Sequence, residues 1–170
     1  MSSQSALMNS AKEALFRVQE SDSVPRTIRV IALDPPSEGV LRKIMDRRWN
    51  HAKFLSAAVS THEQHNGWHI RPAQGLYDLA GSPLNLEEEI RNADLILMLA
   101  TRIGNSHAAA LIGELCSTSH ANVASVVLDV ICASDDEISQ TLAQLRPWSL
   151  MVVVAKAEEY IVDMLTSLRA

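Results

Sequence analysis

The stretch ADLILMLATRIGNSHAAALIGELC, residues 93–116, decides the fold that this chain is predicted to adopt. Residues 94–100 form an apolar run of strand length, which is typical of a central strand buried on both faces of a parallel sheet. The polar elbow TRIGNSH follows at 101–107, and the apolar residues of 107–119 recur at helical spacing. Ligands in open α/β sheets bind outside the carboxyl ends of the strands. The elbow is therefore both a fold signal and the first place to look for function.

The rest of the chain repeats this alternation of strand and helix from residue 27 onward. The pattern predicts a three-layer α/β Rossmann-like sandwich with a mostly parallel sheet of about five strands. Ser37, Asn85 and Ser134 are the expected helix N-caps. Residues 61–85 show no clear periodicity, so they are expected to form loops with at most one short element. The other predicted strands are 27–34, 53–60, 124–131 and 149–155. The other predicted helices are 86–93, 134–145 and 157–169, and residues 35–49 are expected to form a turn that leads into a helix.

The chain divides into two parts by sequence pattern. Residues 1–26 are expected to form an N-terminal helix or arm, because apolar positions recur over 5–20 and the proline of SDSVPR ends the pattern. Residues 27–170 are expected to form a single Rossmann-like domain, since a chain of 170 residues is ordinary for one domain.

Composition excludes some classes of partner. The net charge of −5 argues against nucleic acid, because phosphate binding requires a basic face. Apolar runs fall short of the roughly 20 residues needed to cross a bilayer, and the N-terminus lacks a signal-peptide pattern. Cys116 and Cys132 lie in apolar contexts and are expected to be buried thiols in a reducing compartment. We therefore expect a cytoplasmic protein without a membrane partner.

Three segments resemble the nucleotide-binding half of the FtsZ/tubulin GTPase family. EEEIRNADLILMLATRIGNSHAAALIGELC at 87–116 is similar to that family's signature region, in which AD leads into an apolar strand, a phosphate loop and an alanine-containing helix. FLSAAVS at 54–60 resembles the family's second strand, and residues 124–156 resemble its next strand, helix and strand. The resemblance covers about 130 residues in the order of the elements, and it implies a nucleotide-binding fold.

The phosphate loops depart from the family pattern. The family's signature loop is nearly all glycine, whereas TRIGNSH keeps only Gly104. Pro35 and Pro36 remove two backbone donors from the first loop, and Asp34 adds a negative charge where a phosphate would lie. The chain also ends where the family continues into a second domain that helps to activate water. The resemblance with these departures implies that GTPase activity is not expected.

Three loops are the candidate ligand site, because each follows the predicted carboxyl end of a strand: 34–39, 60–67 and 101–107. The start of the helix after the third loop would favour an anion, with Arg102 as a charged arm. In the alternative interpretation Asn105 or Ser106 merely caps that helix and Arg102 is solvated. The candidate residues are Asp34, Ser37, Gly39, Ser60, Thr61, Thr101, Arg102, Gly104, Asn105, Ser106 and His107.

Other chemistry-bearing residues favour structural interpretations. His62, Glu63, His65 and His69 invite a metal hypothesis, but their spacing fits no zinc pattern, so a solvated loop is favoured and no metal is expected. Asp129 is interpreted as a catalytic carboxylate, a ligand contact or, preferably, a polar residue at an edge. Trp49, Trp68 and Trp148 either mark an interface or cap the core.

The leading hypothesis is a degenerate FtsZ/tubulin-like nucleotide-binding fold that acts as a binding or interaction protein without hydrolysis. The alternative is a small-molecule enzyme or binder that takes a phosphate- or nucleotide-type ligand at the carboxyl ends of the strands. A purely structural subunit that oligomerises through its helices is a third hypothesis. The expected partners are a nucleotide or phosphorylated small molecule and a second copy of the chain; no catalytic residue or cofactor is assigned.

Overall fold

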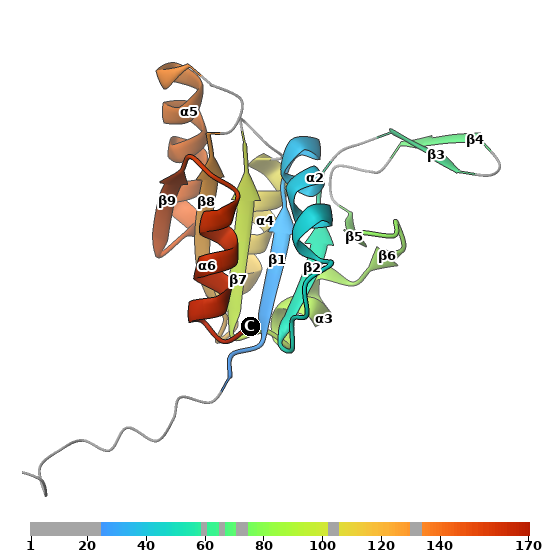
Figure 1. The fold of residues 1–170 in the computed structure, drawn as a ribbon, viewed down its shortest axis with the longest axis horizontal. Helices are drawn as coiled ribbons and strands as arrows, with labels where there is room; N and C mark the ends of the chain where they lie inside the picture. Colours follow the sequence, from blue (N-terminus) through green and yellow to red (C-terminus); the bar gives the residue numbers. More distant parts are fainter. Residues whose placement is uncertain (1–24, 59–60, 65–66, 71–74, 102–105, 130–133) are drawn as a thin grey trace, which may run out of the picture.

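The structure is a computed structural model that describes residues 25–58, 61–64, 67–70, 75–101, 106–129 and 134–170. The predicted N-terminal helix and Cys132 lie outside these described residues. The remainder forms one sheet covered by helices, with a separate hairpin (Figure 1). In the described part, no helix is both long and apolar enough to span a membrane.

The main sheet has seven strands in the order β6-β5-β2-β1-β7-β8-β9. The five predicted strands follow one another in this order from β2 to the β9 edge, and all neighbouring pairs among them run parallel. Continuous apolar sequence explains this, since every residue of the central β7 is buried. These parallel strands are β1 (Ile28–Ala32), β2 (Ala52–Ser56), β7 (Leu95–Ala100), β8 (Asn122–Leu128) and β9 (Met151–Ala155).

The segment expected to be mostly loops instead contains four short strands. β5 (Leu76–Asp78) pairs antiparallel with β2, and β6 (Pro83–Leu84) pairs antiparallel with β5. β3 (Thr61–Gln64) and β4 (Gly67–Ile70) form a two-stranded hairpin of their own. The predicted count of about five strands is therefore wrong. Strands of two to four residues are too short to show an alternating pattern, and β5 is defined by its partner β2 rather than by its own sequence.

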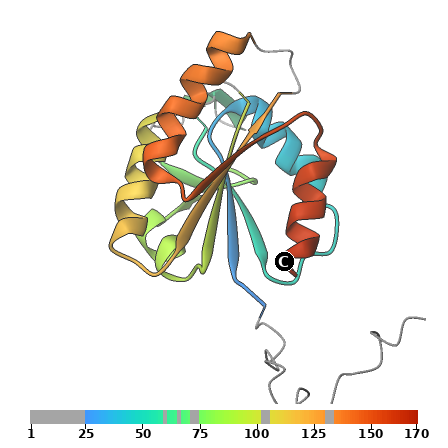
Figure 2. The same ribbon diagram turned by 90° about the vertical axis from the view of Figure 1, so that its left-hand side faces the viewer.

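Helices cover both faces of the sheet, as the predicted three-layer sandwich requires (Figure 2). Leu41 and Ile161 bring two helices to one face, whereas Ile90, Ile112 and Leu145 bring three to the other. The first pair is α2 (Pro35–Ile44) and α6 (Glu159–Ser167). The second group is α3 (Leu86–Arg91), α4 (Ser106–Ser117) and α5 (Asp135–Leu145), which continues into the short 3₁₀ helix η2 (Arg146–Trp148).

The tryptophans of the described core have packing roles. The Trp49 indole donates to the Ile44 carbonyl oxygen at 3.0 Å and meets the Phe54 ring edge-on. Trp148 lies so close to Gly113 that a Cβ atom there would come within 2.6 Å of it. Both half-buried rings pack against the core, which agrees with the core-capping interpretation. The side chain of Trp68 lies outside the described residues.

Candidate functional site at the carboxyl ends of the strands

The strand order fixes where a ligand would be expected. From β1 the chain moves to β2 on one side, and the later parallel strands β7, β8 and β9 follow on the other side. The order therefore reverses between β1 and β7. In doubly wound sheets, ligands bind outside the carboxyl ends of the strands at such a switch point. Asp34 and Thr101 follow the carboxyl ends of these two strands.

Asp34 caps α2, which corrects the expectation that Ser37 is the N-cap. The Asp34 carboxylate accepts from the Ser37 backbone N–H at 2.8 Å, and the Asp34 N–H donates to Ser37 Oγ at 3.3 Å. The Ser37 hydroxyl in turn donates to the Asp34 carbonyl oxygen at 2.9 Å. Pro35 and Pro36 occupy the first two helical positions, where their fixed φ suits a helix start, so the helix begins earlier than Ser37. The other two expected caps, Asn85 and Ser134, are confirmed.

The backbone N–H groups at the start of α2 are hydrogen-bonded within the protein. Pro35 and Pro36 have no N–H, the Ser37 N–H bonds to Asp34, and the Glu38 N–H donates to the Asp34 carbonyl oxygen at 3.0 Å. Within residues 34–38, all of them described, no backbone N–H is left over for an external anion. Helix N-termini bind phosphate through such free N–H groups. This loop therefore lacks the usual means of holding a phosphate.

The Asp34 carboxylate also bridges the switch point itself. One of its oxygens accepts from the Thr101 backbone N–H at 2.6 Å, and the other accepts from the Thr101 hydroxyl at 3.0 Å. Both residues are buried. The Asp34 carboxylate thus accepts from both Thr101 donors at the carboxyl end of β7. A ligand anion at this place would have to compete with it for these donors.

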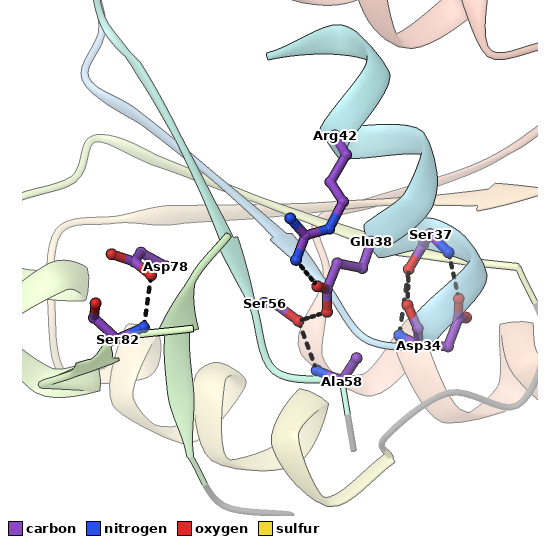
Figure 3. Close-up of polar contacts among 8 residues, drawn as sticks. All are labelled: Asp34, Ser37, Glu38, Arg42, Ser56, Ala58, Asp78 and Ser82. Carbon is purple, nitrogen blue, oxygen red and sulfur yellow. Dashed lines mark hydrogen bonds and ion pairs between the residues drawn. The ribbon is translucent and has the colours of Figure 1, made fainter. Parts of the chain in front are cut away.

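A second buried carboxylate lies beside this one, on α2 (Figure 3). Glu38 accepts from the Ser56 hydroxyl at 2.6 Å and pairs with the Arg42 guanidinium at 2.6 Å. Ser56 ends β2, is fully buried, and accepts from the Ala58 N–H at 3.2 Å. These bonds tie the carboxyl end of β2 to α2. Among the described residues of this region, two carboxylates and one guanidinium give a negative balance of charge, which opposes an anionic ligand.

The structure brings some predicted site residues together and leaves others undescribed. Asp34, Ser37 and Thr101 form one bonded group, while Gly39 lies within α2 with open space where a Cβ would be. His107 is exposed in the first turn of α4. Contact of any of these with a ligand stays a prediction. Ser60, Arg102, Gly104 and Asn105 lie outside the described residues, and so do the side chains of Thr61, which begins β3, and Ser106, which begins α4.

The remaining candidates have no assigned chemistry. His62 and His69 face each other in the register of the β3–β4 hairpin, and their side chains lie outside the described residues. Among the described residues, no group of three metal-ligating side chains occurs. Asp129 follows β8, half-exposed, and its N–H donates to the Ala155 carbonyl oxygen at 2.8 Å. Burial raises the pKa of the Cys116 thiol to about 11, so this buried cysteine is neutral at pH 7 and unsuited to nucleophilic attack.

Glu38 falls within the predicted loop 34–39 but was not singled out there, and Arg42 and Ser56 were not predicted as part of the site. The available signal was positional: Ser56 is the polar end of an apolar strand, and Glu38 lies in the first turn of the helix that follows the neighbouring strand. Carboxyl ends of adjacent parallel strands meet at one edge of the sheet, so the two could have been placed near each other. No protein-family model matches the chain, and no curated protein matches it significantly.

Proposed function

We propose that this protein is a non-hydrolysing Rossmann-like binding protein, a degenerate relative of the FtsZ/tubulin nucleotide-binding fold. The observation that carries the proposal is the bonding of Asp34. Its carboxylate accepts hydrogen bonds from the Ser37 and Thr101 N–H groups at the switch point. Enzymes that cleave phosphate esters need free donors and cations aimed at the phosphates. Here the Ser37 and Thr101 donors, which belong to the described part of the chain, are bonded within the protein, and the nearby Glu38 adds negative charge.

The third candidate loop supports a narrower binding role. α4 begins at Ser106, shortly after β7, and its first turn carries an exposed His107. The N–H groups of a first helical turn lack intrahelical partners and favour an anion. This placement favours the alternative candidate, a small-molecule binder or enzyme that takes a phosphate- or nucleotide-type ligand at 101–107, with Arg102 as its charged contact.

Nucleotide turnover and binding test the proposal separately. Purified full-length protein with GTP and Mg²⁺ is expected to release no phosphate above a protein-free control. Turnover above that control, lost on Arg102→Ala, would overturn the non-hydrolysing proposal.

Titration calorimetry with phosphate, sulfate, GDP and GTP tests the binding role. Arg102→Ala should weaken any bound anion roughly tenfold or more, because a charge-assisted hydrogen bond contributes about 1.5–3 kcal/mol. Arg91→Ala is the matched control, since Arg91 pairs with Glu87 on α3, away from this loop. If wild type binds none of these anions at millimolar concentration, the loop is only a capped turn and the binding role is wrong.

A further inference from the structure

The β9 edge of the main sheet is open and apolar. β9 pairs with β8, and no other strand pairs with it within the described part of the chain. Three apolar side chains at this edge are well exposed: Leu150 by 80%, Met151 by 47% and Val154 by 41%. Alternate residues of an edge strand also point backbone N–H and C=O groups away from their neighbour, ready to pair with another strand.

The opposite edge of the sheet lacks these properties. β6 consists of Pro83 and Leu84 only, and proline cannot donate to a further strand. By contrast, SLMVVVA at 149–155 has no charge and no proline, and β9 keeps an unbroken five-residue register with β8. Natural edge strands are usually protected by charge, proline, bulges or short length. An edge without such protection is expected to be covered by a partner strand.

We propose that β9 pairs antiparallel with β9 of a second copy, about a two-fold axis at Val152, so that one sheet runs through both copies. In this register Leu150 lies opposite the partner's Val154, and Val152 lies opposite the partner's Val152. Leu150, Val152 and Val154 share one face of the strand because side chains alternate. The two-fold axis therefore places exposed apolar residues against each other twice, as cross-strand pairs.

A second copy is the occupant that this strand fits best. The strand offers no charge with which to select a different partner, whereas a two-fold axis matches the strand with itself. The neighbouring register, about Val153, would set Lys156 against the most exposed residue, Leu150. The Val152 register leaves Lys156 beyond the apolar pairs. The proposal does not depend on any ligand at the carboxyl ends, so it goes beyond the proposed function.

Charge substitutions test both the dimer and its register, with mass measured by light scattering on the full-length chain. Wild type is expected to be a dimer at micromolar concentration. Leu150→Lys with Val154→Lys sets like charges opposite each other twice and should give a monomer. Leu150→Lys with Val154→Glu sets opposite charges in the same two places and should restore the dimer. Met45→Lys is the matched control, because Met45 is a 44% exposed apolar residue at the end of α2; it should stay dimeric.

A cysteine at the two-fold axis checks the register when a charged variant is poorly folded. Opposed antiparallel residues have Cα atoms within disulfide range. Val152→Cys, in a chain with Cys116→Ala and Cys132→Ala, should therefore form a covalent dimer on oxidation, while Met45→Cys in the same background should not. A monomeric wild type, a dimer that survives the double lysine change, or failure of the opposite-charge variant to restore the dimer would each overturn the proposal.

Discussion

The two ends of the parallel sheet hold their polar groups in different ways. At the carboxyl end, Asp34, Ser37 and Thr101 are all buried, and the Asp34 carboxylate accepts from uncharged donors. We call this group the carboxyl-end network. At the amino end, Arg29 of β1 and Lys53 of β2 both bond the Glu89 carboxylate of α3; the Arg29 and Glu89 side chains are mostly buried, whereas Lys53 is 43% exposed. We call this group the amino-end cluster.

The difference predicts how much stability is lost when the polar bonds at each end of the sheet are broken. A buried hydrogen bond leaves an unsatisfied group when its partner is removed, whereas an ion pair with one exposed member, such as Lys53, is partly replaced by water and salt. Breaking the carboxyl-end network should therefore lower the free energy of unfolding strongly, by an amount insensitive to salt. Breaking the amino-end cluster should lower it less, by an amount that depends on pH. The carboxyl end, where the proposed ligand site lies, is thus expected to be the more tightly bonded end of the sheet.

The largest effect is expected from Asp34→Ala. This change removes the cap of α2 and leaves the buried N–H groups of Ser37 and Thr101 without their acceptor. Loss of a cap and of charge-assisted hydrogen bonds should lower the free energy of unfolding by about 3 kcal/mol or more. Urea unfolding of wild type and variant at neutral pH measures this loss, which should be the same in low and in high salt. A loss below about 1 kcal/mol would show that the network does not hold the switch point together.

A smaller loss is expected from Glu38→Ala, on the same side of the comparison. Glu38 bonds the buried Ser56 hydroxyl, but its Arg42 partner is partly exposed and can turn to water. We expect a loss of about 2 kcal/mol in the free energy of unfolding. A double-mutant cycle with Ser56→Ala should show coupling, because the two side chains touch, whereas the matched pair Glu38→Ala and Ser134→Ala should be additive. Additivity of the first pair would contradict the Glu38–Ser56 contact.

The sequence predicted the centre of the fold better than its edges or its site. The five parallel strands were predictable because short aliphatic and β-branched runs such as LILMLA and MVVVA, alternating with helical patterns, are typical of a parallel sheet. Asp34 was placed at the site, but its bonds to Thr101 join residues 67 positions apart, which no local pattern reveals. The cap was assigned to Ser37 because two prolines suggested a loop, although proline suits a helix start. β5 and β6 depend on pairing across the sheet edge.

In the amino-end cluster, Glu89→Gln should lower the free energy of unfolding by about 1 kcal/mol, and this loss should depend on pH. Burial alone would raise the pKa of Glu89, but hydrogen bonds and charge from Lys53 and Arg29 outweigh it and lower the pKa. A lowered folded-state pKa means that the stabilisation is complete above the unfolded value of about 4.3 and is lost as pH falls through the lower folded value.

Urea unfolding of wild type and Glu89→Gln at neutral and acidic pH checks this dependence. The difference between the two proteins should be full at neutral pH and should shrink below about pH 4. Glu87→Gln is the matched control, because Glu87 pairs with Arg91 on the exposed surface of the same helix and should change little. A difference that grows on acidification would contradict the pKa direction.

The smallest effect is expected from Asp94→Asn, also at the amino end. Asp94 precedes β7 and accepts from the exposed Thr27 N–H at 2.7 Å. Asparagine keeps an oxygen that can accept this bond, so the free energy of unfolding should fall by about 0.5 kcal/mol or less. The six residues of β7 place Asp94 roughly 20 Å from Thr101, beyond a Debye length of about 8 Å at physiological salt. Affinity for phosphate or GTP should therefore be unchanged in calorimetry, in contrast to Arg102→Ala. A large loss of affinity in a folded Asp94→Asn variant would place the ligand at the amino end of the sheet and reverse the comparison between the two ends.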